Sequence, residues 1–220
     1  MDGGSGHDAL YGEAGHDVLI GGSGHDALHG GTGHDSLDGG SGDDALTGHS
    51  GNDILNAGSG HDTLDGGEEQ DRLDAGSGDD SLTGGNGNDI LMGGSGHDAY
   101  WFNRGDGHDT IQETSGTADS LHFGASITPL DLMLSRQADD LHMAVYGSNE
   151  AVTIENWYTG STNQVETLQA GNGQRLLNTQ VQSLIQAMAT FSTQTGLTWE
   201  QAIAQRPQDV QMILAANWQS

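Results

Sequence analysis

Aspartate recurs every nine residues, without a slip, from Asp8 to Asp98. Around each aspartate the chain repeats the phrase Gly-Gly-x-Gly-x-Asp-x-Leu-x, from residues 3–11 in the first copy to residues 93–101 in the eleventh. A strict short period predicts one small unit stacked along an axis, with each unit contacting its neighbours. Because Arg72 is the only Lys or Arg within residues 1–101, this array of carboxylates needs positive charge from outside.

Composition limits the partners of such an array. The chain has 220 residues and a formal charge of −27, and residues 1–101 hold 20 of its 32 acids and 28 of its 37 glycines. Low hydrophobicity with high net charge is typical of disordered chains, so we expect the array to fold only with counter-ions. An acidic surface repels nucleic acid and anionic lipid, and neither is an expected partner.

Three further absences in the sequence bear on function class. The chain has no Cys, which excludes disulfides and thiolate metal sites. Its apolar runs are too short to span a bilayer. No secretion signal follows Met1, and Asp2 fits the ninth position of a preceding repeat. We therefore expect a fragment with Met1 added as a start; a natural start at Met1 is the alternative.

The order of residues within the repeat predicts a cation site. Glycine at positions one, two and four permits a tight turn with positive φ, which points carbonyl oxygens inward beside the aspartate at position six. A site made of carboxylate and carbonyl oxygens suits a hard cation, and calcium accepts a cage of many protein oxygens more readily than magnesium does. Positions seven to nine predict a short strand with the position-eight side chain pointing inward.

Two turns and two strands then close one coil of two repeats, and coils stack at roughly 4.8 Å into parallel sheets. One apolar side chain per nine residues makes a thin core, so we expect bound ions to complete the fold. An ion between each turn and the turn one coil later gives the repeat pairs 1–3 to 9–11. This pairing predicts about nine calcium ions, whose charge offsets most of the −27.

The eleven in-phase nonapeptides resemble the RTX, or haemolysin-type, calcium-binding repeats of proteins exported by type I secretion. The resemblance covers residues 3–101 and implies an all-β fold, a right-handed parallel β-roll with calcium in its turns. It implies carboxylate ligands at position six, with two more from degenerate turns: Asp8, Asp17, Asp26, Asp35, Asp44, Asp53, Asp62, Asp71, Asp80, Asp89, Asp98, Asp109 and Asp119. It also implies backbone carbonyl ligands from Gly3, Ser5, Gly12, Ala14, Gly21, Ser23, Gly30, Thr32, Gly39, Ser41, Gly48, Ser50, Ala57, Ser59, Ala75, Ser77, Gly84, Asn86, Gly93 and Ser95.

Some repeats depart from this pattern, at position one (Ala57, Ala75) and at position two (Glu13, His49). The largest departure is the eighth repeat, residues 66–74, where Glu69 stands at position four in place of glycine. We expect this turn to be distorted, which puts its ions in doubt. Glu68 or Glu69 ligating an ion, or Arg72 pairing with one of them, are the alternatives.

Position five carries a stripe of histidines: His7, His16, His25, His34, His61 and His97. A transition-metal stripe is one interpretation. The same position also takes Asp43, Asn52, Gln70, Asp79 and Asn88. We therefore interpret it as any polar, outward-facing residue.

The chain after the array divides into two further parts. We expect the roll to cover 1–113, a β-rich capping domain 114–177 and a helical tail 178–220. Bulky residues at the junction (Tyr100, Trp101, Phe102, Phe123) are expected to plug the open end of the roll, with carbohydrate stacking as the alternative. Segments 140–142, 152–157 and 165–168 resemble the domain that often follows haemolysin-type repeats.

The capping part and the tail differ in their periodicity. Alternating apolar residues within 125–177 predict short antiparallel strands. Val181, Leu184, Ile185 and Met188 have helical spacing, Thr198 with Gln201 predicts a capping box, and Pro207 suits a first helical turn. The C-terminal segment resembles an uncleaved type I secretion signal; a pair of ordinary packing helices is the alternative.

The sequence predicts a calcium-switched folding and export module and no catalytic site. It contains no His-Glu-x-x-His, Gly-x-Ser-x-Gly or Walker motif. We expect a secreted monomer that is unfolded at low calcium, is exported by type I secretion machinery as part of a larger protein, and folds outside the cell. Alternatives are a calcium-rigidified adhesin or ligand-binding module and a calcium-dependent enzyme domain. Ice binding is disfavoured because Thr32 is the only threonine at position three.

Overall fold

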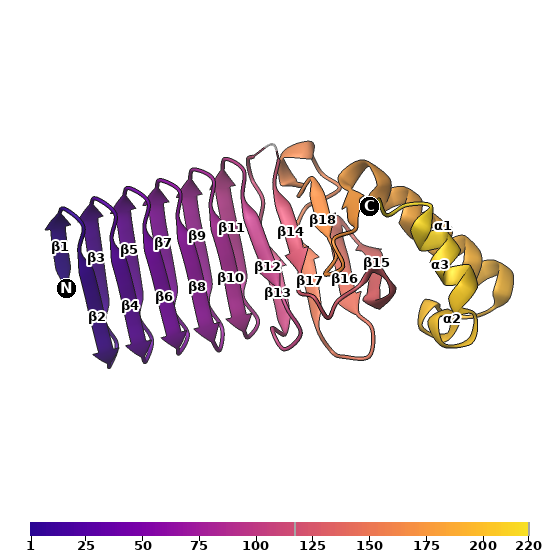
Figure 1. The fold of residues 1–220 in the computed structure, drawn as a ribbon, viewed down its shortest axis with the longest axis horizontal. Coiled ribbons are helices and arrows are strands. Elements are labelled where there is room, and N and C mark those ends of the chain that lie inside the picture. The colour runs from indigo at the N-terminus through magenta and orange to yellow at the C-terminus, as the bar shows by residue number, and fades with distance from the viewer. Residues whose placement is uncertain (117, 220) are drawn as a thin grey trace.

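The computed structural model describes residues 1–116 and 118–219 (Figure 1), an elongated stack of strands with helices at its C-terminal end. One parallel-stacked sheet contains β1 (Asp2–Ser5), β3 (Val18–Ser23), β5 (Ser36–Ser41), β7 (Ile54–Ser59), β9 (Arg72–Ser77), β11 (Ile90–Ser95), β13 (His108–Ile111) and β17 (Ala151–Ile154). The facing sheet contains β2 (Ala9–Ala14), β4 (Ala27–Thr32), β6 (Ala45–Ser50), β8 (Thr63–Glu68), β10 (Ser81–Asn86), β12 (Ala99–Phe102), β14 (Ser120–Phe123) and β18 (Thr167–Gln169).

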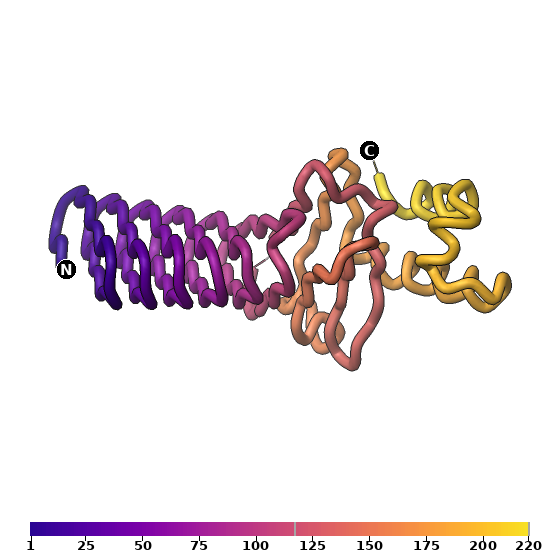
Figure 2. The backbone as a smooth tube through the Cα atoms, turned by 90° about the horizontal axis from the view of Figure 1, so that it is seen from below, coloured from indigo at the N-terminus to yellow at the C-terminus, as the bar shows by residue number. Residues whose placement is uncertain are grey.

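Successive strands alternate between the two sheets, so each pair of repeats makes one coil of a flattened solenoid (Figure 2). Residues 18 apart pair in parallel register, as in Leu10↔Leu28 and Leu28↔Leu46. The position-eight leucines form a ladder inside, and Leu28 and Leu37 are completely buried. The predicted all-β, parallel solenoid is therefore confirmed.

The strands are longer than the three residues predicted. Each full strand has six residues, from position seven of one repeat to position three of the next, as in Ala27–Thr32. Within β4 the side chain of Leu28 and the backbone of Gly30 face inward while His29 faces outward, which is the period-two alternation of a strand. Position one thus lies inside the solenoid beside the leucine ladder, and this placement matters for the metal centre.

Within the repeat array, three residues hold positive φ without being glycine. Glu13 (69°) and His49 (74°) stand at position two, and Glu69 (78°) stands at position four. Glycine occupies these places in most other repeats because L-residues reach this left-handed region only at a cost of about 1–2 kcal/mol. The register with the neighbouring coils is unbroken at Glu13 and His49, which both pair with Gly31.

The parallel stack continues beyond the array before the chain reverses direction. β13 pairs with β17, and β14 pairs with β18, both in parallel. The antiparallel strands predicted within 125–177 then follow at the edges: β15 (Leu132–Gln137) and β16 (Asp140–Val145) extend one sheet, and β19 (Arg175–Leu177) extends the other. These reversals give the roll a C-terminal end with a different hydrogen-bonding pattern from the array.

The aromatic plug contains three of the four predicted residues. Tyr100, Phe102 and Phe123 are buried, but the side chain of Trp101 is 43% exposed. Since Tyr100 and Phe102 point inward from β12, the alternation of the strand directs Trp101 outward. There it stacks on His122 at 4.5 Å between ring centroids. The expectation that Trp101 fills the end of the roll is wrong.

Three helices complete the chain: α1 (Asn178–Thr195), α2 (Trp199–Gln205) and α3 (Pro207–Ala215). Two short 3₁₀ turns, Pro129–Asp131 and Ser161–Asn163, precede them. The predicted capping box is present at α2, where Thr198 Oγ1 accepts from the Gln201 amide at 3.2 Å. Val181, Leu184 and Met188 join one continuous core that runs from Leu10 to Trp218. Among the described helices, none combines the length and the apolar character needed to cross a membrane.

Candidate metal centre

The position-six aspartates line up in two rows, one along each edge of the roll. In each row the backbone N–H of one aspartate donates to Oδ1 of the aspartate one coil later. Asp44 N–H donates to Asp62 Oδ1 at 2.7 Å, and Asp62 N–H donates to Asp80 Oδ1 at 2.8 Å. The same bond links every successive aspartate of each row from Asp8 to Asp98. Each carboxylate from Asp26 to Asp98 therefore has a fixed orientation, with Oδ1 committed to the backbone.

The second oxygen of these carboxylates has no protein partner. Within the described chain, Oδ2 is buried and accepts no hydrogen bond in Asp8, Asp17, Asp26, Asp35, Asp44, Asp53, Asp62, Asp71, Asp80, Asp89, Asp98 and Asp109. Buried carboxylate oxygens are costly unless a hydrogen bond or a cation compensates them. Twelve such atoms in regular rows indicate a set of sites for cations.

Burial also changes the acidity of these groups. Desolvation raises the pKa of Asp62 and Asp80 to about 6, that of Asp71 to about 7 and that of Asp109 to about 8. In each case the raised pKa means that the neutral acid is more favourable, relative to the carboxylate, in the folded chain than in the unfolded chain. Holding the rows ionised at neutral pH thus opposes folding of the protein alone, and a bound cation would remove that cost.

Backbone carbonyls border the same interior space as the orphan oxygens. A Cβ placed on Gly21 would lie 2.6 Å from Asp26 Oδ2 and 2.7 Å from the carbonyl oxygen of Gly39. A Cβ on Gly39 would lie 2.6 Å from Asp44 Oδ2 and 2.8 Å from the carbonyl oxygen of Ala57. Position one therefore brings a carboxylate oxygen and a carbonyl oxygen together, which explains why its side chain is absent or small.

Position three contributes differently. Its carbonyl accepts the N–H of position four from the coil before, as from Gly24 to Ser41 at 2.8 Å and from Gly42 to Ser59 at 2.8 Å. A carbonyl oxygen has two lone pairs, so one remains for a cation. The position-one carbonyls lie beside Oδ2, and the position-three carbonyls stay predicted ligands.

These donors fit calcium. All are oxygens, from carboxylate and backbone, which is the donor set of hard cations. No three His, Asp or Glu side chains of the described residues gather into a metal cluster, so a site here needs carbonyl ligands as well as carboxylates. The position-six aspartates with the position-one carbonyls would hold the ion. Calcium would supply the positive charge that the rows lack.

The rows run past the array. Asp89 N–H donates to Asp109 Oδ1 at 3.1 Å, and Asp98 N–H donates to Asp119 Oδ1 at 2.9 Å. Asp119 N–H in turn donates to Glu166 Oε2 at 2.9 Å, so a glutamate extends the second of these rows. Glu166 was not among the predicted site residues. Its signal is the phrase Glu166-Thr167-Leu168, which repeats the Asp-x-Leu of the array with a longer acid.

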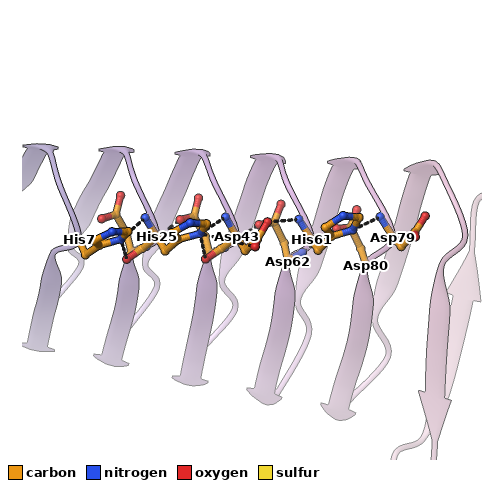
Figure 3. Close-up of polar contacts among 9 residues, drawn as sticks. His7, His25, Asp43, His61, Asp62, Asp79 and Asp80 are labelled. Carbon is orange, nitrogen blue, oxygen red and sulfur yellow. Dashed lines mark hydrogen bonds and ion pairs between the residues drawn. The ribbon is translucent and has the colours of Figure 1, made fainter.

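Position five has a more specific role than the polar surface that we predicted (Figure 3). Its side chain accepts the backbone N–H of position five one coil later. His7 Nδ1 accepts from His25 at 2.8 Å, His25 Nδ1 from Asp43 at 2.7 Å, and Asp43 Oδ1 from His61 at 2.9 Å. The position is polar and exposed, as predicted. Its His, Asp and Asn residues also share an acceptor atom two bonds beyond Cβ, which forms this ladder. Accepting at Nδ1 requires neutral imidazole with its proton on Nε2.

The eighth repeat interrupts this second ladder. Gln70 N–H lies 3.3 Å from Asn52 Oδ1, and the Gln70 side chain, within the described chain, accepts nothing from the next coil. Gly51 N–H lies 3.4 Å from the Glu68 carbonyl oxygen, against 2.8 Å at Gly33 and Ser50. The aspartate row is intact, however, because Asp53 N–H donates to Asp71 Oδ1 at 2.8 Å.

Arg72 does not pair with the acids beside it. Its guanidinium lies 3.4 Å from Met92 Sδ on the outer face of the sheet, and no ion pair in the described chain joins it to Glu68 or Glu69. Both glutamates are exposed. The distortion predicted for this repeat is therefore confined to positions three to five of its turn.

Replacing Gln70 with asparagine should repair the ladder. The shorter side chain places its Oδ1 where Asn52 and Asn88 place theirs, and one added hydrogen bond contributes about 1 kcal/mol. We expect Gln70→Asn to raise the free energy of unfolding of the calcium-loaded protein by about that amount in urea denaturation. Gln70→Ala is the control and should resemble the parent protein. Equal stabilities of the two variants would contradict this role for position five.

One known protein family has a sequence model that matches this region. The model of the RTX calcium-binding nonapeptide repeat matches four times, at residues 2–37, 29–64, 38–73 and 65–100. The matched residues contain both aspartate rows from Asp8 to Asp98, with their buried Oδ2 atoms. Residues 2–100 of this chain are thus RTX calcium-binding nonapeptide repeats, folded here as a parallel β-roll.

Proposed function

We propose that this chain is a calcium-dependent folding module that is unfolded at low calcium and folds when calcium fills the turns of the roll. The observation that carries the proposal is the pair of rows of buried, unpartnered aspartate oxygens. With a net charge of −27 and a core of one apolar ladder per sheet, the chain alone lacks a sufficient driving force for the roll. The coordinating residues, and a count of about nine ions, belong to this proposal.

A role in export follows from the same dependence. Calcium sites of extracellular modules have dissociation constants of roughly 10⁻⁴–10⁻³ M, far above the calcium concentration of a cytosol. The chain would stay loose enough to be threaded outward and would fold outside the cell as part of a larger secreted protein. The RTX family is typical of secreted proteins, which supports type I secretion as the route, with the C-terminal helical segment as its signal. The roll in this scheme is a monomer without catalytic groups.

The ligand assignment is tested most sharply at Asp62. Asparagine at this position still accepts the Asp44 N–H through its Oδ1 but replaces the orphan carboxylate oxygen with an amide. We expect Asp62→Asn to raise the calcium midpoint of folding at least about tenfold, since even outer-shell losses at metal sites cost 10–100-fold. The measurement is a calcium titration followed by far-UV circular dichroism.

Asp38→Asn is the matched control. Asp38 lies on the same roll and is exposed on the outer face of β5. Its substitution by asparagine removes the same charge as Asp62→Asn does. Its midpoint should stay within about twofold of the parent protein, because water and salt largely screen an exposed charge on the outer face of the sheet. Equal shifts for the two variants would mean that net charge alone governs calcium binding, and would refute the assignment of Asp62 as a ligand.

A further inference from the structure

One buried carboxylate lies beside the aspartate rows without belonging to the repeat. Glu113 is 3% exposed, and its Oε2 has no hydrogen-bond partner among the described residues. Glu113 lies two residues after Ile111, the last residue of β13. Ile111 pairs with Leu91 of β11, and Gly93 likewise lies two residues after Leu91. Glu113 therefore stands at position one of its coil, where the array has glycine or alanine.

Position one directs a side chain toward the metal centre. At Gly93, one coil earlier, an added Cβ would overlap Asp98 Oδ2 and the hydroxyl oxygen of Tyr100. A glutamate at this place in the next coil therefore enters the space that the carboxylates border. Burial is the main cause that raises the pKa of Glu113 to about 8, and repulsion from Asp119, Asp98 and Glu166 adds to it.

Tyr100 fixes which oxygen of Glu113 is free. Its hydroxyl donates to Glu113 Oε1 and accepts the N–H of Gly93 at 2.8 Å. The phenol thereby satisfies one carboxylate oxygen and leaves Oε2 as an unpartnered acceptor close to Asp98, whose Oδ2 is also buried and unpartnered. Tyr100 stands where the other ten repeats have leucine. The two residues that depart from the repeat, Tyr100 and Glu113, are thus hydrogen-bonded to each other.

We propose that Glu113 is a calcium ligand, in an additional site at the C-terminal end of this row that Asp98 and Asp119 border. The site takes a divalent cation with hard-oxygen preference, as the array does. It carries one more carboxylate than the array sites, and more ligand charge raises calcium affinity. These side chains do not form a metal cluster as they stand, so binding has to draw Glu113 Oε2 toward its neighbours. The inference rests on the proposed calcium-dependent folding and adds a residue that the repeat pattern lacks.

Glu113→Gln tests the proposal in the full chain. Glutamine keeps the acceptor for the Tyr100 hydroxyl and removes only the charged oxygen. We expect the variant to bind one calcium ion fewer, or to bind one ion at least about tenfold more weakly, by isothermal titration calorimetry and metal analysis after gel filtration. Glu200→Gln, at an exposed position on α2, should bind as the parent protein does.

Two outcomes decide against the site. If Glu113→Gln keeps the ion count and affinities, Glu113 is a buried neutral acid that Tyr100 holds, and the proposal is wrong. If glutamine disturbs folding, Glu113→Gly restores the residue of the array at this position and should show the same loss of one ion; an unchanged count would again overturn the site. Loss of calcium binding in Asp62→Asn beside an unaffected Glu113→Gln would leave the proposed function standing without this ligand.

Discussion

Replacing Gly51 with alanine should break the roll between two of its coils. Gly51 has a φ of +128°, and a Cβ there would overlap the carbonyl oxygen of Gly33 in the preceding coil. The obstructing atom is backbone, so no side-chain rotation relieves the overlap, and the coils have to separate. We expect a loss on the order of 4 kcal/mol or more in the unfolding free energy of the calcium-loaded protein, the range of severe single substitutions.

Gly6→Ala provides the matched control. Gly6 occupies the same position four with a similar φ of +119°, but no atom lies within 4 Å of a Cβ built on it. This variant should lose only the cost of positive φ, about 1–2 kcal/mol. Because each coil of a solenoid contacts only its neighbours, hydrogen exchange should show lost protection around residues 33 and 51 in the first variant. Equal losses in the two variants would contradict the packing of coils through their position-four backbones.

Withdrawal of calcium should have the largest effect of all. Without cations the two rows hold a line of carboxylates whose Oδ2 atoms are buried and unpartnered. Burial, together with repulsion from Asp89, Asp53 and Glu69, raises the pKa of Asp71 to about 7. Ionised at neutral pH, these groups repel one another across successive coils and lack any compensating partner. We expect far-UV circular dichroism to change from disordered to β-rich, cooperatively, as calcium is added.

Magnesium is the control for this transition. It keeps several water ligands and demands near-octahedral geometry at 2.0–2.1 Å, roughly, which a cage of fixed backbone carbonyls does not offer. Magnesium at the same concentration should leave the spectrum disordered. A full β-signal in magnesium would mean that charge neutralisation alone folds the chain and that the turns do not select calcium.

The strict period explains how much of this structure the sequence alone could predict. The inward position of Leu28 and the place of Asp62 in a row of acids could be predicted from this one sequence. The nine-residue repeat fixes the coil, the inward leucine and the row of acids together. Where the spacing changes, the prediction weakens: one coil spans 20 residues between Asp89 and Asp109, and 47 between Asp119 and Glu166. Glu166 was missed for that reason, since no period leads to it.

The role of position five and the role of Glu113 could not be predicted from residue type. Position five takes His, Asp and Asn, which have little in common as residue types and share an acceptor atom that only the hydrogen bonds reveal. Glu113 is a departure at a position where glycine is the rule, and a single acid in a chain of 32 acids carries no signal of its own. Its burial and its contact with Tyr100 come from tertiary structure.

The central claim is that cations bound to the aspartate rows form part of the folded core. The most direct test is a two-dimensional amide NMR spectrum of this chain in excess EGTA at ordinary ionic strength, repeated after calcium is restored. The account predicts collapsed, narrow amide dispersion for residues 1–116 in EGTA and a well-dispersed spectrum with calcium. A dispersed spectrum of the roll in EGTA would contradict it.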